Sequence, residues 1–211
     1  MRKQLGFLVL LATQFLGQTA QANITGSKHD FAGESWNPGG QICQVCHTPH
    51  NAKSAAGYAP LWNHTITTAT FTPYNSVTLN ASVGQPQGVS KLCLSCHDGT
   101  VALEAFGTAT TGSNFVNGEW KLGTDLSNDH PVSFTYNTAL ATADGTLFDP
   151  ATKVSGISPS GTIQSDMLVG GNVECSTCHD VHNGANNGAG STSLLVKSNV
   201  GSALCLTCHN K

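Results

Sequence analysis

The chain has 211 residues, enough for one domain or two small ones, and carries 12 acidic against 9 basic residues. Aromatic residues make up only 7% and charged residues 10% of the sequence, so a large, well-packed core of side chains is not expected. No cluster of Lys or Arg follows the basic pair at positions 2 and 3, which excludes nucleic acid and anionic membrane surfaces as expected partners.

The first 22 residues have the pattern of a cleaved secretory signal peptide. The basic pair precedes a mostly apolar run from Leu5 to Leu16, and an Ala-Gln-Ala sequence ends at residue 22. The run is shorter than the roughly 20 apolar residues of a spanning helix, and no later stretch is longer, so no membrane span is predicted. We expect a mature chain of residues 23–211 with a net charge of −5, because the segment removes two positive charges from a chain of net charge −3. Such a chain would be secreted to the extracellular space or cell surface, with the periplasm as the alternative.

All eight cysteines fall into four Cys-x-x-Cys-His motifs, the attachment pattern of c-type haem. The two thiols add across the two vinyl groups on one porphyrin edge, and the histidine places an imidazole under the iron. Four disulfides would leave the histidine after each pair unexplained, structural zinc needs no histidine at that position, and a thioredoxin-like pair would occur once. We therefore predict four covalently bound haem c groups. They would be attached to Cys43, Cys46, Cys93, Cys96, Cys175, Cys178, Cys205 and Cys208, with proximal iron ligands His47, His97, His179 and His209.

Regular secondary structure is expected to be sparse. In chain order, the pattern predicts a helix at Ser90–His97, strands at "TVALEAFG" and "PVSFTYN", and a helix at Ala203–His209. The segments "FGTATTGSNF" and "TADGTLFDPATKVSGISPSG" have the composition of loops. The predicted fold class is a mostly irregular, coil-rich multihaem cytochrome c with short helices at the haem motifs and few β-strands, in which the porphyrins supply the apolar core.

Five further histidines are candidates for the sixth iron ligand: His29, His50, His64, His130 and His182. Met167 is the only methionine after residue 22 and could serve one haem at most. A second histidine keeps the reduction potential lower than a methionine would. Four bis-histidine haems need four of the five histidines, which leaves one spare and no open coordination position for a substrate.

The order of the motifs indicates an internal duplication. The first and third read C-x-x-C-H-x-x-H-N, whereas the second and fourth read L-C-L-[ST]-C-H, giving the order A, B, A, B. We predict two dihaem modules, at about 23–100 and 125–211. His29 and His130 precede the A motifs in "SKHDF" and "NDHPVSF" and are expected to play matching roles, as are His50 and His182.

His50 lies on the same short turn as His47, so it is not expected to reach the iron that His47 binds. The same holds for His182 and the third haem. If the modules are equivalent, His182 would bind the haem of the preceding B motif, on Cys93 and Cys96. His50 would then bind the fourth haem of a neighbouring copy.

His64, in "PLWNH", has no counterpart in the second half of the chain, where "SLLVKSN" occupies the similar place. It is therefore the predicted spare. The alternative is that His64 binds iron while His29 is free.

The chain resembles the extracellular multihaem cytochromes that polymerise into conductive filaments, and among them the tetrahaem c-type cytochromes of the OmcE kind. The resemblance lies in "GSKHDF", "ICQVCHTPHNA", "PLWNH", "LCLSCHDGT", "NDHPV", "ECSTCHDVHN" and "ALCLTCH", which are spread over most of the mature chain. In such filaments the histidine at the position of His50 binds a haem of the next subunit. The resemblance implies an electron carrier, not an enzyme, that self-associates and exchanges electrons with other redox proteins or extracellular acceptors.

Two alternatives stay open at this point. Soluble electron shuttles of the periplasm carry similar motifs. A multihaem reductase acting on nitrite or a similar oxyanion would need a five-coordinate haem beside acid/base groups, and five spare histidines for four irons argue against it.

Overall fold

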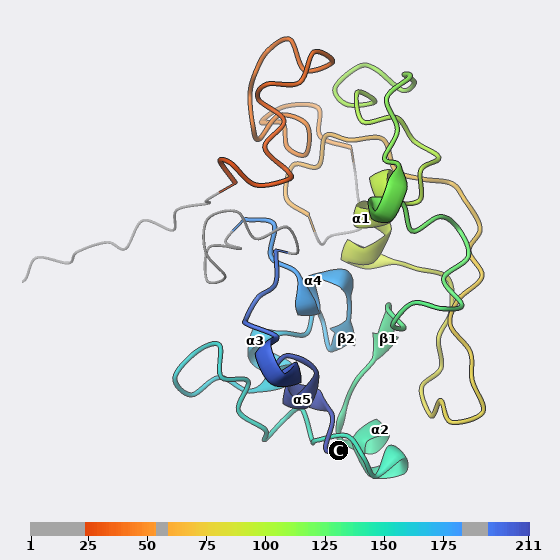
Figure 1. The fold of residues 1–211 in the computed structure, drawn as a ribbon, viewed down its shortest axis with the longest axis vertical. Coiled ribbons are helices and arrows are strands. Elements are labelled where there is room, and N and C mark those ends of the chain that lie inside the picture. Colours follow the sequence, from red (N-terminus) through yellow and green to blue (C-terminus); the bar gives the residue numbers. More distant parts are fainter. Residues whose placement is uncertain (1–23, 54–58, 183–193) are drawn as a thin grey trace, which may run out of the picture.

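The computed structural model describes residues 24–53, 59–182 and 194–211 (Figure 1). The predicted signal peptide, residues 1–22, lies outside these ranges. The described chain consists mostly of turns and irregular segments, with short helices and a single two-stranded sheet, so the predicted coil-rich fold class is confirmed. The elements are α1 (Gly88–His97), η1 (Gly118–Trp120), β1 (Phe134–Thr135), α2 (Thr138–Asp144), α3 (Ile163–Asp166), β2 (Asn172–Val173), α4 (Cys175–Cys178), η3 (Val200–Ser202) and α5 (Cys205–Cys208).

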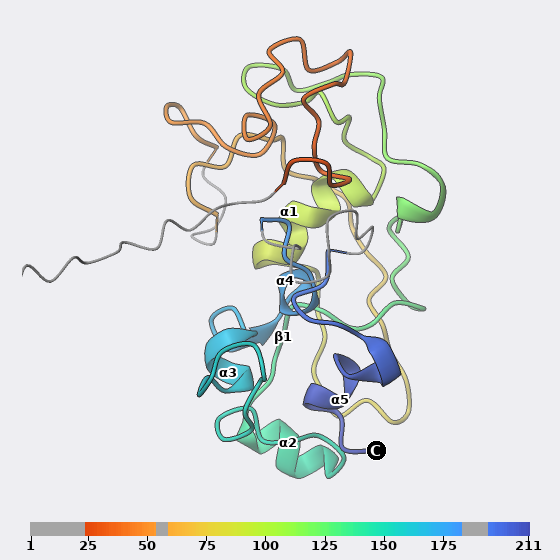
Figure 2. The ribbon, with the colours of Figure 1, turned by 60° about the vertical axis from the view of Figure 1, so that its left-hand side comes forward.

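The elements are spread along the long axis of the molecule, but not in chain order. The described N-terminal segment and α1 lie towards one end, α4 lies in the middle beside α1, and α2, α5 and the C-terminus lie at the other end (Figures 1 and 2). Three of the four Cys-x-x-Cys-His motifs are therefore carried by helices that are spread along this axis.

One predicted strand is confirmed and the other is wrong. The segment "PVSFTYN" contains β1, which pairs antiparallel with β2 so that Phe134 faces Val173. The segment "TVALEAFG" forms turns instead, because the N–H of Ala105 donates to the carbonyl of Ala102 at 3.0 Å, and only an isolated bridge at Phe106 remains extended. Local turn bonds thus use the backbone groups that a strand would present to a neighbour.

Two helices were not predicted, and each begins at a residue with a capping side chain. The side chain of Asn137 accepts from the N–H of Leu140 at 2.9 Å, and Gly145 ends α2 with a φ of 72°, so α2 begins and ends with standard capping residues. Thr162 and Ser165 form a capping box at α3. The segment 142–161, predicted as a loop, thus contains the last turn of α2.

The two predicted helices are present with different bounds. α1 begins two residues before Ser90, whereas α5 is confined to one turn. Gly201 has a φ of 62°, in the left-handed region, so the backbone does not run as one helix from η3 into α5. No helix in the described ranges has the length and hydropathy needed to cross a bilayer.

The side-chain core is divided into two clusters that support the motif helices. The larger consists of Phe134, Tyr136, Ala141, Ile163, Met167, Val173 and Leu204, and the partly buried Cys178 and Cys208 pack against it. The smaller consists of Phe71, Leu126 and Leu94 of α1. Both clusters are small for a chain of this length, which agrees with the low aromatic content.

Candidate functional site

Each described motif places its two cysteines on one helical turn. In α4 and α5 the N–H of the histidine after the turn donates to the carbonyl of the first cysteine at 3.0 Å, and in the first motif the N–H of His47 does the same to Cys43 at 2.8 Å. The second motif forms the last turn of α1. The same local bond therefore fixes the spacing of two thiols and one imidazole in motifs that are far apart in the sequence.

Backbone contacts hold the proximal histidines in place. His47, His179 and His209 each form an isolated antiparallel bridge, with Trp62, Leu195 and Leu147 respectively. The ring Nδ1 of His47 lies 2.8 Å from the carbonyl oxygen of Pro60, and that of His97 lies 2.7 Å from the carbonyl oxygen of Trp120. An imidazole whose Nδ1–H donates to a carbonyl presents Nε2 as a metal ligand.

Three distal histidines lie opposite proximal ones. The ring centres are 6.1 Å apart for His29 and His97, 5.9 Å for His47 and His182, and 6.3 Å for His130 and His209. Two imidazoles that bind opposite sides of one metal ion, with metal–nitrogen bonds of about 2 Å, have ring centres roughly 6 Å apart. All three pairs therefore have the separation of two axial ligands on one iron.

The structure corrects the predicted partner of His182. Its ring faces His47 of the first motif, not His97 of the second, because His29 takes the place opposite His97. α4 packs against α1, and the segment after α4 returns to the first motif. His29 and His130 do lie in matching places, since each faces the proximal histidine of the B motif in its own predicted module. His130 thus occupies the place opposite His209 of the fourth motif, where the sequence predicted His50 of a neighbouring copy.

His29 is held in the form that binds metals. Burial first, and then the nearby His97, His179 and His182, together lower the pKa of His29 to about 4, so the ring is neutral at pH 7. Its Nδ1 is buried and has no hydrogen-bond partner among the described residues. A buried imidazole that has an unsatisfied nitrogen and lies opposite a second imidazole is suited to bind the metal of a cofactor placed between the two rings.

His64 and His50 differ from the paired histidines. His64 is 1% exposed, and its two ring nitrogens lie 2.9 Å from the carbonyl of Thr65 and 3.0 Å from that of Ala102. Burial lowers the pKa of His64, so the neutral ring has a single N–H and donates to one of these two carbonyls. His50 is exposed beside the first motif. Met167 is 4% exposed and packs in the larger core cluster with Ile163.

None of the eight cysteines, all of which lie in the described ranges, forms a disulfide. Burial raises the pKa of the second thiol of each motif, to about 11 for Cys46, Cys178 and Cys208 and to about 12 for Cys96. The helices of the second and third motifs pack against each other, and the thiols of Cys93 and Cys175 lie near enough that each shifts the pKa of the other, upward for Cys93 and downward for Cys175. The second and third motifs therefore meet at their first cysteines.

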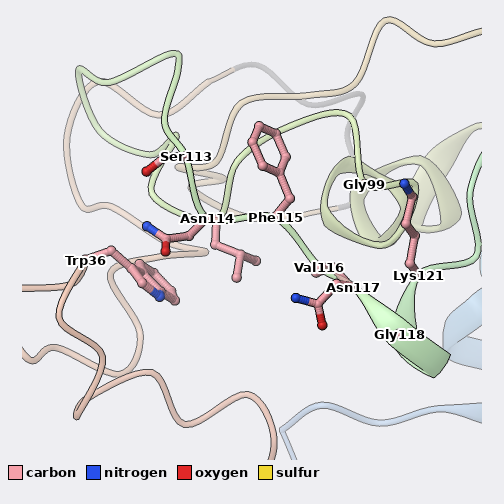
Figure 3. Close-up of a pocket in the computed structure, with 10 residues that line it drawn as sticks. Trp36, Gly99, Ser113, Asn114, Phe115, Val116, Asn117, Gly118 and Lys121 are labelled. Carbon is pink, nitrogen blue, oxygen red and sulfur yellow. The ribbon is translucent and has the colours of Figure 1, made fainter.

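A cavity of about 630 Å³ lies between Trp36 and the segment that follows α1, which includes Phe115 and Lys121 (Figure 3). Its wall includes Trp36, whose ring centre is 5.1 Å from that of Phe31, and Phe31 in turn contacts His29. The opposite wall includes Lys121, next to the residue whose carbonyl holds His97. This volume is within the range of about 300–1,000 Å³ found for small-molecule and cofactor sites.

The donor set fits haem better than a directly bound metal. In the described part of the chain, no three or more His, Cys, Asp or Glu side chains gather around a point that could hold a metal ion. Structural zinc needs four such ligands, whereas iron in a porphyrin takes two from the protein. The paired imidazoles next to the thiol pairs supply the two protein ligands that iron in a porphyrin needs.

Sequence reasoning missed the groups that orient the imidazoles. The carbonyls of Pro60 and Trp120 hold His47 and His97, but every residue has a carbonyl, so no residue type marks this role in the sequence. The buried carboxylate of Glu174, at the junction of α1 and α4, was also missed.

Residues 168–211, which contain the third and fourth motifs, match the family described as "Doubled CXXCH motif". A comparison with curated proteins gave no match. The family match supports a multihaem c-type cytochrome with covalently bound haem c, and this class implies electron transfer.

Proposed function

We propose that the chain is the repeating subunit of an extracellular conductive filament, in which four bis-histidine haem c groups carry electrons. The observation that carries the proposal is the set of three imidazole pairs with ring centres 5.9 to 6.3 Å apart. A haem bound at each motif supplies one-electron exchange between ferrous and ferric iron. With both axial positions taken by histidine, a substrate has no place to bind, which favours a carrier over a reductase.

The placement of the motifs supports transfer between neighbouring sites. α1, which carries the second motif, packs against α4, which carries the third. His182, three residues after the third motif's histidine, faces His47 of the first. The chain thus brings three motifs close together, so that electrons need not cross a long stretch of protein.

The corrected pairing gives His50 a new expected partner. His182 belongs to the second module and faces the A motif of the first, so equivalence of the modules predicts that His50 faces the A motif of the module before it. That module lies in a neighbouring copy, and its A motif carries His179. His50 is exposed, as a ligand supplied to another copy must be. We therefore propose that His50 binds the iron of a neighbour's third haem, which links copies into a filament.

Electron microscopy of the purified, exported protein tests this proposal. The wild-type protein is expected to form filaments and to exceed the mass of the polypeptide by four haems. His50→Ala is expected to abolish filaments and to leave a haem-loaded monomer with one high-spin iron. Exposed His50 has no resolved role in folding, so the variant should fold.

Two results would contradict parts of the proposal separately. A wild-type monomer with all four irons low-spin would favour the soluble shuttle and refute the filament. A purified protein without covalent haem would refute electron transfer itself.

A further inference from the structure

Two motif helices share one buried carboxylate. Glu174 is only 4% exposed and directly precedes α4, where it is the N-cap residue. Figures 1 and 2 show α1 and α4 next to each other. Glu174 joins them, because it caps α4 and its side chain accepts hydrogen bonds from Ser90 of α1.

Three neutral donors surround this carboxylate. Oε2 accepts hydrogen bonds from the backbone N–H of Ser90 at 3.1 Å, from the hydroxyl of Ser90, and from the hydroxyl of Ser133 at 3.0 Å. The hydroxyl of Ser90 in turn accepts from the N–H of Cys175 at 3.0 Å. In every one of these contacts Glu174 only accepts, which is what an ionised carboxylate does.

The carboxylate lies where the second and third motifs meet. Cys175 directly follows it, and Ser90, which donates to it twice, stands three residues before Cys93 in α1. α1 and α4, which carry Cys93 and Cys175, pack against each other at the same junction.

A buried charge at this place acts strongly on a neighbouring redox centre. Water screens charges at the surface but screens a buried charge much less. A nearby negative charge stabilises the more positive ferric iron relative to ferrous iron, which lowers the reduction potential.

We infer that Glu174 is a positioning and tuning residue that lowers the reduction potentials of the haems at the second and third motifs together. The inference rests on the proposed haem attachment at these motifs. Glu174 thus gives the haems at two of the four motifs a more negative reduction potential than they would have without its charge.

Spectroelectrochemical titration of the haem-loaded full chain tests the inference with Glu174→Gln, which removes the charge and keeps the shape. We expect the midpoint potentials of two haems to rise while those of the other two stay constant. A roughly tenfold change in the ferrous-to-ferric ratio at fixed potential corresponds to about 59 mV for one electron. Asp125→Asn is the matched control, because the carboxylate of Asp125 is exposed and its loss changes the net charge equally.

A second variant separates charge from structure. Ser133→Ala removes one donor and leaves the carboxylate less compensated, so the same two potentials are expected to fall. If the role of Glu174 were purely structural, the midpoint potentials would not shift in opposite directions in Glu174→Gln and Ser133→Ala. Ser133→Ala also keeps the inference testable if Glu174→Gln does not fold.

The outcomes for the two proposals differ. Equal shifts in Glu174→Gln and Asp125→Asn, or no shift in a fully haem-loaded protein, would overturn the role of Glu174 alone. A wild-type chain without covalent haem, detected by its mass, would instead overturn the proposed function.

Discussion

The places of the rings separate His64 from the three paired histidines. His47 and His97 use Nδ1 for a backbone carbonyl and keep Nε2 for a metal, and His29, His130 and His182 each lie opposite a proximal histidine. His64 donates its single N–H to one of two nearby carbonyls and faces no proximal histidine in the described structure.

Alanine variants of the distal histidines test this distinction by electron paramagnetic resonance of the haem-loaded protein. His29→Ala, His130→Ala and His182→Ala are each expected to convert one of the four haems from low-spin to high-spin, because each removes one axial nitrogen. His64→Ala is the matched control and is expected to keep all haems low-spin, at the cost of some thermal stability. A high-spin signal from His64→Ala would show that the assignment of the spare is wrong.

At the scale of residues, the sequence identifies the attachment cysteines and proximal histidines, but not which distal histidine lies opposite which proximal one. The Cys-x-x-Cys-His spacing identifies thiols and proximal histidines because covalent chemistry demands neighbours in the chain. The partner of His182 depends on how α4 packs against α1, and no short pattern encodes that contact. The lack of a counterpart in the second half nevertheless indicated His64 as the spare, and no proximal histidine lies opposite it among the described ring pairs.

At the scale of elements, the single-turn helices α4 and α5 are too short to be stable alone. α4 is fixed from outside by the Ser90 hydroxyl of α1, which accepts from the N–H of Cys175. This bond between two motif helices aligns the first cysteines of the second and third motifs. The sequence predicted the turns from their motifs but offered no sign that one serine joins them.

Two serine variants on the joined helices are expected to behave differently in thermal unfolding of the haem-loaded protein. Ser90 is 0% exposed and its hydroxyl serves both Glu174 and Cys175, so Ser90→Ala removes the acceptor of the Cys175 N–H and one of the three donors to Glu174. We expect a loss of about 1–3 kcal/mol from the unsatisfied N–H. Ser176, in α4, has a buried hydroxyl without a hydrogen-bond partner among the described residues, so Ser176→Ala should be neutral or slightly stabilising. Equal losses in both variants would contradict the bridging role of Ser90.

For the molecule as a whole, the composition already indicated that side chains alone form a weak core. Two small clusters, a two-stranded sheet and isolated bridges agree with that expectation. The division into two modules stays a prediction. The corrected pairing nevertheless links them, because His182 of the second faces His47 of the first.

The last prediction concerns the chain without haem. Cys178 and Cys208 pack against the larger cluster, so a porphyrin attached to them would extend that cluster with apolar surface. The three imidazole pairs also join segments that are distant in sequence, and without iron between them these links are lost. We therefore expect the full-length chain, produced in cells that cannot attach haem, to be largely unfolded. Far-ultraviolet circular dichroism and limited proteolysis against the haem-loaded chain measure this, and a protease-resistant apoprotein with cooperative thermal unfolding would contradict it.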